Sequence, residues 1–287
     1  MRRPRLLIAA AVTALAVAGS LTAPATSPAQ AAGRWAPADR AKITPGVQMY
    51  TDGAQCTANF VFTDADRRVY VGYAAHCAGT GEATDTNGCD AASLPLGTRV
   101  RFARGGSLVG GGETVGRGRL VYSSWLTMQR LGTTNQNACA FNDFALVRVG
   151  RKHVGKVNPS VPFWGGPVGL NTEGTSVGSE VYSFGSSSLR AGLVELAPKV
   201  GTSLGSWAGG WSHDVYTATP GVPGDSGSAF LDGQGRAIGT LSTLALAPYA
   251  GSNGVSDLAH ELRFARKHSG IDRLRLVRGT EAFSPLL

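Results

Sequence analysis

Three short segments of the chain each contain a residue of a type used in acyl-transfer chemistry. They hold His76 in Ala-Ala-His-Cys, Asp143 in Asn-Asp-Phe-Ala-Leu and Ser226 in Gly-Asp-Ser-Gly-Ser. A serine hydroxyl is a poor nucleophile near neutral pH and needs a base to take its proton. Histidine suits that role because its pKa lies near neutrality, and a carboxylate orients its ring. These residues indicate Ser226 as nucleophile, His76 as general base and acid, and Asp143 as the orienting group.

The order of the three segments carries more information than any one of them. Alone, Gly-Asp-Ser-Gly is often only a turn, a histidine beside a cysteine is often packed at the end of a strand, and Asn-Asp commonly begins a strand. Together, in the order His, Asp, Ser, they resemble the trypsin/chymotrypsin-like serine peptidases, in particular secreted bacterial members. The resemblance runs in islands from about Gln55 to Leu262.

The resemblance implies a fold and an activity. The implied fold is all-β, with two six-stranded antiparallel barrels and a short C-terminal helix. The implied activity is that of a secreted serine endopeptidase working through an acyl-enzyme, on protein or peptide substrates and without a cofactor. Two other functions stay open: a catalytically silent binding protein on the same scaffold, and a secreted esterase using the same triad, because the triad does not by itself choose amide over ester. The α/β-hydrolase alternative is set aside, because its Gly-x-Ser-x-Gly elbow is absent and its serine precedes the acid and the histidine.

The resemblance also assigns residues around the nucleophile. The backbone N–H groups of Gly224 and Ser226 are expected to form the oxyanion hole. Asp225 is expected to be structural. No Ile-Val-Gly-Gly-like segment is present to supply the N-terminal amine that pairs with this aspartate in animal members, so we expect a buried arginine or a hydrogen-bond cluster as its partner.

Specificity is predicted from the position six residues before the nucleophile. Trypsin-like members carry an acidic residue there, whereas this chain has Pro220. Cleavage after Arg or Lys is therefore not expected, unless Asp232 or Asp257 reaches the pocket. Substrate-binding residues are predicted on two segments, namely Pro220 and Gly221 together with Ser242 and Thr243. The second of these segments is expected to pair with the substrate backbone as an added strand.

Four cysteines in an exported chain suggest two disulfides, and four cysteines allow three pairings. In the family that the chain resembles, a bridge ties the positions of Cys56 and Cys77 and fixes the histidine loop. The expected second bridge, Cys89–Cys139, would brace the aspartate loop. A structural zinc site is the competing interpretation, and it is disfavoured because no Cys-x-x-Cys pair occurs. No metal site is predicted.

The first 31 residues have the features of a secretory signal peptide. Arginines precede the apolar run 6–19, and Ala-Gln-Ala at 29–31 fits a cleavage site before Ala32. An N-terminal membrane anchor is disfavoured by the short apolar run. The formal net charge of the 287-residue chain is +8, and scattered basic residues favour a solvated surface over nucleic-acid binding. We expect an extracellular monomer without membrane association after cleavage.

The remaining chain is predicted to be one peptidase domain, 32–287, with barrels at about 45–150 and 170–265. Gly-rich 104–118 and 158–178 are predicted to be loops. A helix is expected near the C-terminus, capped by Ser256 and ending before Gly270. Alternating β-branched and aromatic residues bounded by turn residues predict strands, at Ala58–Phe62, Val69–Ala74, Thr98–Phe102, Arg119–Tyr122, Phe144–Val149, Glu180–Phe184, Val215–Ala218, Ser228–Leu231 and Ala237–Leu241.

Overall fold

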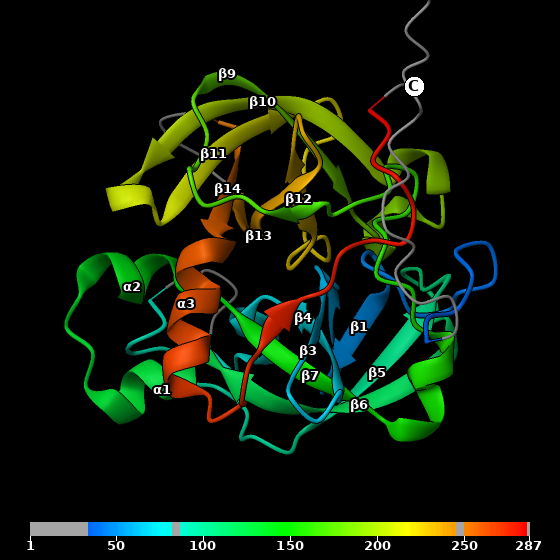
Figure 1. Cartoon of the computed structure of the whole chain (residues 1–287), viewed down its shortest axis with the longest axis horizontal. Helices are drawn as coiled ribbons and strands as arrows, with labels where there is room; N and C mark the ends of the chain where they lie inside the picture. The colour runs from blue at the N-terminus through cyan, green and yellow to red at the C-terminus, as the bar shows by residue number, and fades with distance from the viewer. Residues whose placement is uncertain (1–33, 82–86, 245–249, 286–287) are drawn as a thin grey trace, which may run out of the picture. The chain divides into compact units, whose positions relative to one another are not determined.

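The computed structural model describes residues 34–81, 87–244 and 250–285. The predicted signal peptide and its cleavage site lie outside these residues. Two antiparallel sheets dominate the described chain (Figure 1). No helix among the described residues has the length and apolar character needed to cross a membrane.

The first sheet has the strand order β15-β3-β4-β7-β6-β5-β1-β2. Strands β2 and β3 are two parts of one extended segment, residues 54–63, which pairs with β1 at its beginning and with β4 at its end. This shared segment closes six strands into a barrel. The strands are β1 (Gln48–Thr51), β2 (Ala54–Thr57), β3 (Val61–Thr63), β4 (Val69–Tyr73), β5 (Arg99–Arg104), β6 (Glu113–Ser123), β7 (Ala145–Val149) and β15 (Arg275–Leu276).

The second sheet has the order β12-β9-β10-β11-β14-β13-β8, and β12 also pairs with β13. That extra pairing closes a six-stranded antiparallel barrel, to which β8 adds in parallel. The predicted fold class is thus confirmed. The strands are β8 (Gly169–Leu170), β9 (Val177–Phe184), β10 (Pro198–Trp207), β11 (Ser212–Thr217), β12 (Ala229–Asp232), β13 (Arg236–Leu244) and β14 (Asn253–Asp257).

Alternation along the strands separates the buried clusters. On β4, Val69 and Val71 point into the cluster inside the first barrel, whereas Tyr70 joins a second cluster that also contains Tyr182 and Leu231 of the other sheet. Successive side chains of a strand point to opposite faces, so one strand serves both clusters. The second cluster packs the two barrels together, and a third fills the second barrel.

Within the described residues three α-helices accompany the sheets: α1 (Ser124–Leu131), α2 (Gln136–Phe141) and α3 (Leu258–His268). The C-terminal helix was expected, but its cap was not. Asp257, not Ser256, caps α3, since its carboxylate accepts from the His260 N–H at 2.8 Å. Ser256 lies within β14 between two partner strands, so its backbone is committed to the sheet.

Several elements differ from the sequence-based expectation. The predicted loop 104–118 contains the start of β6, and the predicted loop 158–178 contains β8 and the start of β9. Strand β10 was not predicted, because Pro198 and its glycines hide the alternation. Its Gly201 is needed where the backbone of Tyr216 approaches so closely that a Cβ would clash.

Candidate active site

His76 lies on a 3₁₀ turn, η1 (Ala75–Ala78), directly after strand β4. The next residue, Cys77, is bridged to Cys56 of β2, and the second predicted disulfide, Cys89–Cys139, is also formed. The first bridge ties the histidine turn to a neighbouring strand of the same barrel. Because both sulfurs are in a disulfide, they offer no thiolate to a metal ion beside His76.

Asp143 holds the His76 residue at two points. Its Oδ2 lies 2.6 Å from His76 Nδ1, and its Oδ1 accepts from the His76 backbone N–H at 2.8 Å. Burial alone would lower the pKa of His76, but the charge of Asp143 and the hydrogen bond to it outweigh burial and raise that pKa above 6.5. The other ring nitrogen, Nε2, makes no hydrogen bond within the described residues.

Asp143 is itself buried between α2 and β7, with its side chain 5% exposed. Burial would raise the pKa of this carboxyl. The opposing effects of His76, and of hydrogen bonds from His76 and Ser242, are larger, so the pKa is lowered. Ser242, which the sequence placed in the substrate wall, donates its hydroxyl to Asp143 Oδ2 at 2.5 Å. Strand β13 of the second barrel therefore helps to keep the carboxylate ionised.

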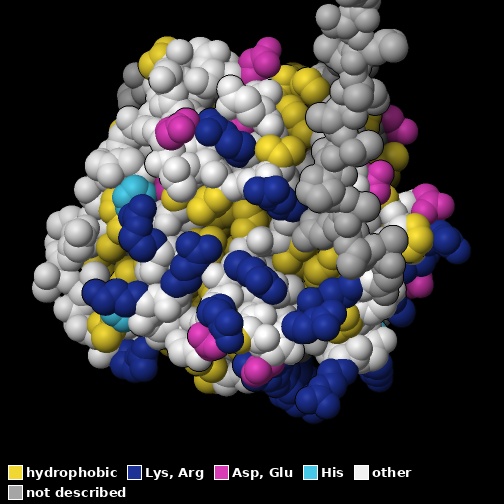
Figure 2. Space-filling model, in the orientation of Figure 1, with side chains coloured by type: hydrophobic (Ala, Val, Ile, Leu, Met, Phe, Trp, Pro, Cys, Tyr) yellow, Lys and Arg dark blue, Asp and Glu magenta, His cyan; other side chains and the backbone are white. Residues whose placement is uncertain are grey.

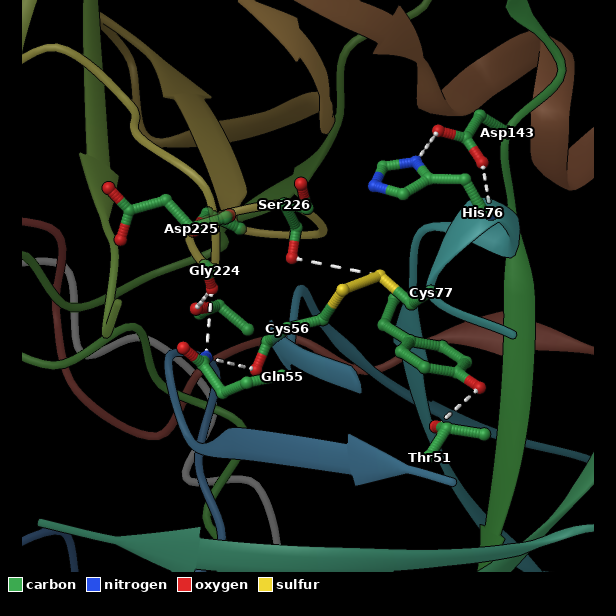
Figure 3. Close-up of a disulfide and its surroundings, with 12 residues drawn as sticks. Thr51, Gln55, Cys56, His76, Cys77, Asp143, Gly224, Asp225 and Ser226 are labelled. Atoms are coloured by element: carbon green, nitrogen blue, oxygen red, sulfur yellow. Dashed lines mark hydrogen bonds and ion pairs between the residues drawn. A yellow bond between two sulfur atoms is a disulfide. The ribbon is translucent and has the colours of Figure 1, made fainter. Parts of the chain in front are cut away.

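Ser226 lies in the loop that joins β11 to β12. Gly224 and Gly227 on either side have φ angles of +94° and +90°, a region that favours glycine. The carbonyl of Ser226 accepts from the Thr57 N–H at 2.8 Å, which fixes the loop against the first barrel. Figure 3 shows Ser226 beside the imidazole of His76, across a gap, and within the described residues no hydrogen bond joins the two side chains.

The backbone N–H groups of Gly224 and Ser226 donate to no acceptor within the described residues. Their neighbours do donate: Asp225 N–H to Val222 and Gly227 N–H to Leu241. The Gly224 carbonyl is turned to the first barrel, where Gln55 and Thr57 donate to it at 2.9 and 2.8 Å. The two free donors are those expected to form an oxyanion hole.

Asp225 has an arginine partner, as the sequence suggested, although Arg190 is only partly buried and the fully buried cation is Lys199. The Asp225 carboxylate is fully buried and lies 2.6 Å from Arg190 Nη2 and 3.1 Å from Lys199 Nζ. It also accepts from the Ser187 N–H at 2.9 Å. Desolvation, which Asp225 only partly offsets, lowers the pKa of Lys199. The loop that carries Ser226 is thus anchored by charge to the segment that precedes β10.

The residues predicted to bind substrate come from two segments that one side chain connects. The buried Asn253 of β14 accepts from Gly221 N–H at 2.7 Å and donates to the carbonyl of Thr243 at 3.3 Å. Sequence reasoning missed Asn253, because an asparagine at the start of a strand has no distinguishing local signal. The Pro220 carbonyl, on the first segment, accepts from Arg190 at 2.9 Å.

Asp232 and Asp257, the two carboxylates considered for a basic-residue pocket, are paired with other residues. Asp232 binds Arg236 at 2.7 Å, and Asp257 binds His213 at 3.0 Å. The ring of His213 also lies 2.9 Å from Ser206 Oγ. Ser206, His213 and Asp257 are thus a further serine, histidine and aspartate in contact, although His213 is fully buried.

Comparisons by sequence and by structure give different results for this chain. No family pattern and no curated protein sequence matches this chain. Solved structures that are similar include Thermobifida fusca Protease A (16% identity, TM-score 0.48), covering 83% of this chain and 99% of that one. Others are Nocardiopsis Protease (19%, TM-score 0.47; 82% and 98%) and Cellulomonas bogoriensis chymotrypsin (18%, TM-score 0.45; 82% and 98%). By its own strand topology, this chain has the trypsin-like two-barrel fold.

Proposed function

We propose that this protein is a secreted serine endopeptidase that cleaves peptide bonds through Ser226, His76 and Asp143. The observation that carries the proposal is the double contact of Asp143 with the His76 ring and backbone, next to a serine whose loop offers two free N–H donors. This arrangement combines an oriented base, a nucleophile and an oxyanion site, which together suffice for acyl transfer.

The proposed reaction begins with attack of Ser226 Oγ on the substrate carbonyl carbon. His76 Nε2 takes the hydroxyl proton, and the N–H groups of Gly224 and Ser226 stabilise the oxygen that becomes negative. The hydrogen bond between the Ser226 hydroxyl and the His76 ring is expected to form when substrate binds, since such hydrogen bonds are often loose without substrate. His76 then gives its proton to the leaving amine, and water hydrolyses the acyl-enzyme by the reverse sequence.

We propose that the residue before the cut is small or apolar. The Asn253 side chain hydrogen-bonds to both Gly221 and Thr243 and so connects the two predicted substrate-binding segments. The guanidinium of Arg190 donates to the Pro220 carbonyl. A substrate Arg or Lys would meet no free carboxylate from the described residues of these two segments. An unpaired buried charge costs several kcal/mol, so turnover of such substrates should fall by orders of magnitude.

The test is a digest of a peptide library with purified protein that begins at Ala32, followed by sequencing of the products. Wild-type protein should cut, mainly after small or apolar residues, and Ser226→Ala should not cut. Ser206→Ala is the matched control, because it removes the serine of the other serine–histidine–aspartate group and should leave cleavage unchanged.

The same three proteins assayed with acyl esters separate the alternatives. Ester hydrolysis without peptide cleavage would make the protein an esterase. Binding of peptides by all three proteins without turnover would make it a silent relative. Loss of activity in Ser206→Ala but not in Ser226→Ala would contradict the assigned nucleophile. A clear preference for Arg or Lys would contradict the proposed pocket.

A further inference from the structure

A strongly basic groove lies on the outer surface of the first barrel, apart from the candidate active site. Its volume is about 1230 Å³. Figure 2 shows Lys and Arg side chains gathered in the half of the view that the first sheet occupies, with few acidic side chains among them. The residues that line the groove include Arg99, Arg117, Arg119, Arg148, Arg151 and Lys152.

Three of these arginines form a row across neighbouring strands. Arg99 of β5 is paired with Arg119 of β6, and Arg119 is paired with Arg148 of β7. Directly paired residues on adjacent strands lie within about 5.5 Å, and like charges at such positions destabilise a sheet. All three side chains are exposed. The row therefore places positive charges on neighbouring strands, where their repulsion destabilises the folded sheet.

Carboxylates do not neutralise this row. Within the described residues, Arg99, Arg119 and Arg148 take part in no ion pair. The acid on the groove wall, Asp66, lies 2.7 Å from Arg68 and is already paired. Arg119 donates from Nη1 to the Gly97 carbonyl at 2.9 Å. The other guanidinium N–H groups of the row have no acceptor within the described residues and remain available to a ligand.

We propose that the groove binds a linear polymer of phosphate groups. Arginine rather than lysine dominates the lining, and the planar guanidinium matches phosphate oxygens in two-point hydrogen bonds. A row of three arginines suits successive anionic groups of one chain better than a single small anion. Such binding would offset the repulsion within the row.

The groove and the candidate triad lie at opposite ends of the same two strands. β4 runs from the groove at Val69 toward His76, and β7 runs from Asp143 toward the groove at Arg148. At about 3.3 Å per residue, these separations are on the order of 17–23 Å. A polymer in the groove would therefore leave the candidate site open to substrate.

The test is calorimetric titration of the Ser226→Ala protein with short-chain inorganic polyphosphate, which needs no catalytic activity. With about five phosphate contacts, affinity should fall roughly 100-fold between 50 and 200 mM salt. The triple variant Arg99→Gln, Arg119→Gln, Arg148→Gln should bind at least about tenfold more weakly. The matched control, Arg263→Gln, Lys267→Gln, Arg278→Gln, removes the same charge from exposed positions outside the groove and should bind as the parent does.

Three results would overturn the proposal. They are an absence of binding at low salt, equal weakening in both triple variants, and tighter binding of polyglutamate than of polyphosphate at matched charge. The last result would assign the groove to an acidic polypeptide. If the groove triple variant does not fold, the single variant Arg119→Gln, at the centre of the row, replaces it with the same expected direction. Because every measurement is of binding, failure here is independent of the proposed peptidase activity.

Discussion

At the scale of single residues, the pKa values of Asp143 and His76 are shifted in opposite directions. Both shifts would support the proposed reaction. Asp143 stays ionised although it is buried, and its charge raises the pKa of His76 above 6.5. Burial and charge therefore act against each other on both groups, and in both the local partners dominate. The contact from Ser242 belongs to this balance, and the sequence could not reveal it because it joins residues 99 positions apart.

Replacing Asp143 with asparagine tests this balance. Asp143→Asn should lower kcat about 10⁴-fold, because an amide does not hold the imidazole in the required tautomer. The acid limb of kcat/KM should move to lower pH as well, since the charge that raises the pKa of His76 is gone and burial remains. The measurement is a pH–rate profile beside that of Asp39→Asn, an exposed control. A loss of less than about tenfold would show that Asp143 does not orient the base.

Glu261 of α3 is a second buried carboxyl near the candidate site. It is 0% exposed, and the Thr240 hydroxyl donates to its Oε2 at 3.1 Å. Burial and the charge of Asp143 raise its pKa well above the ordinary 4.5. Glu261 therefore stays protonated in the folded protein at pH values where the unfolded chain has released this proton.

This difference makes stability depend on pH in a defined direction. Above about pH 4.5 the folded state holds more protons than the unfolded state, so the contribution of Glu261 to stability falls as pH rises. Glu261→Gln, which mimics the neutral form, should gain stability relative to wild type by about 1.4 kcal/mol per pH unit between that point and the raised pKa of the folded state, above which the gain levels off. Urea unfolding at several pH values measures the gain. A difference that stays constant with pH would mean that Glu261 does not hold its proton.

At the scale of elements, the sequence predicted the strands that carry the candidate residues better than those between them. β4 and β7 are mostly apolar, with the exposed Arg148 as the one charged residue of the two strands, and their bounds agree within a residue or so with those predicted. β10 and β14 were missed, because glycine and polar residues replace the alternation where strands approach closely. The helices α1 and α2 were also missed, although Ser123 and Asn135 stand before them as N-caps.

The bridge on α2 should support both stability and the position of Asp143. Cys89 and Cys139 are 50 residues apart in the sequence. Removing the bridge as Cys89→Ala, Cys139→Ala should cost about 4 kcal/mol, because the unfolded chain gains loop entropy. At a temperature where circular dichroism shows the variant to be folded, kcat/KM should also fall. Full activity in the folded variant would separate this bridge from the aspartate loop.

At the scale of the whole molecule, the candidate site is built from both barrels. The first supplies His76 and Asp143, and the second supplies Ser226 and the supporting Ser242. The residue types of the candidate triad and their order could be predicted from the sequence, because each triad residue lies in a short segment that can be recognised by itself. The anchoring of Asp225 by Lys199, the role of Asn253 and the arginine row could not, since each arises only when distant strands pair.

The most direct test of the central claim is mass spectrometry of the protein after brief exposure to a fluorophosphonate or a slowly deacylating ester. We expect a single covalent adduct, located at Ser226 by peptide mapping, formed faster as pH rises through the pKa of His76. The adduct should be absent in Ser226→Ala and present in Ser206→Ala. An adduct at Ser206 or another residue, or no adduct in folded wild-type protein, would contradict the account.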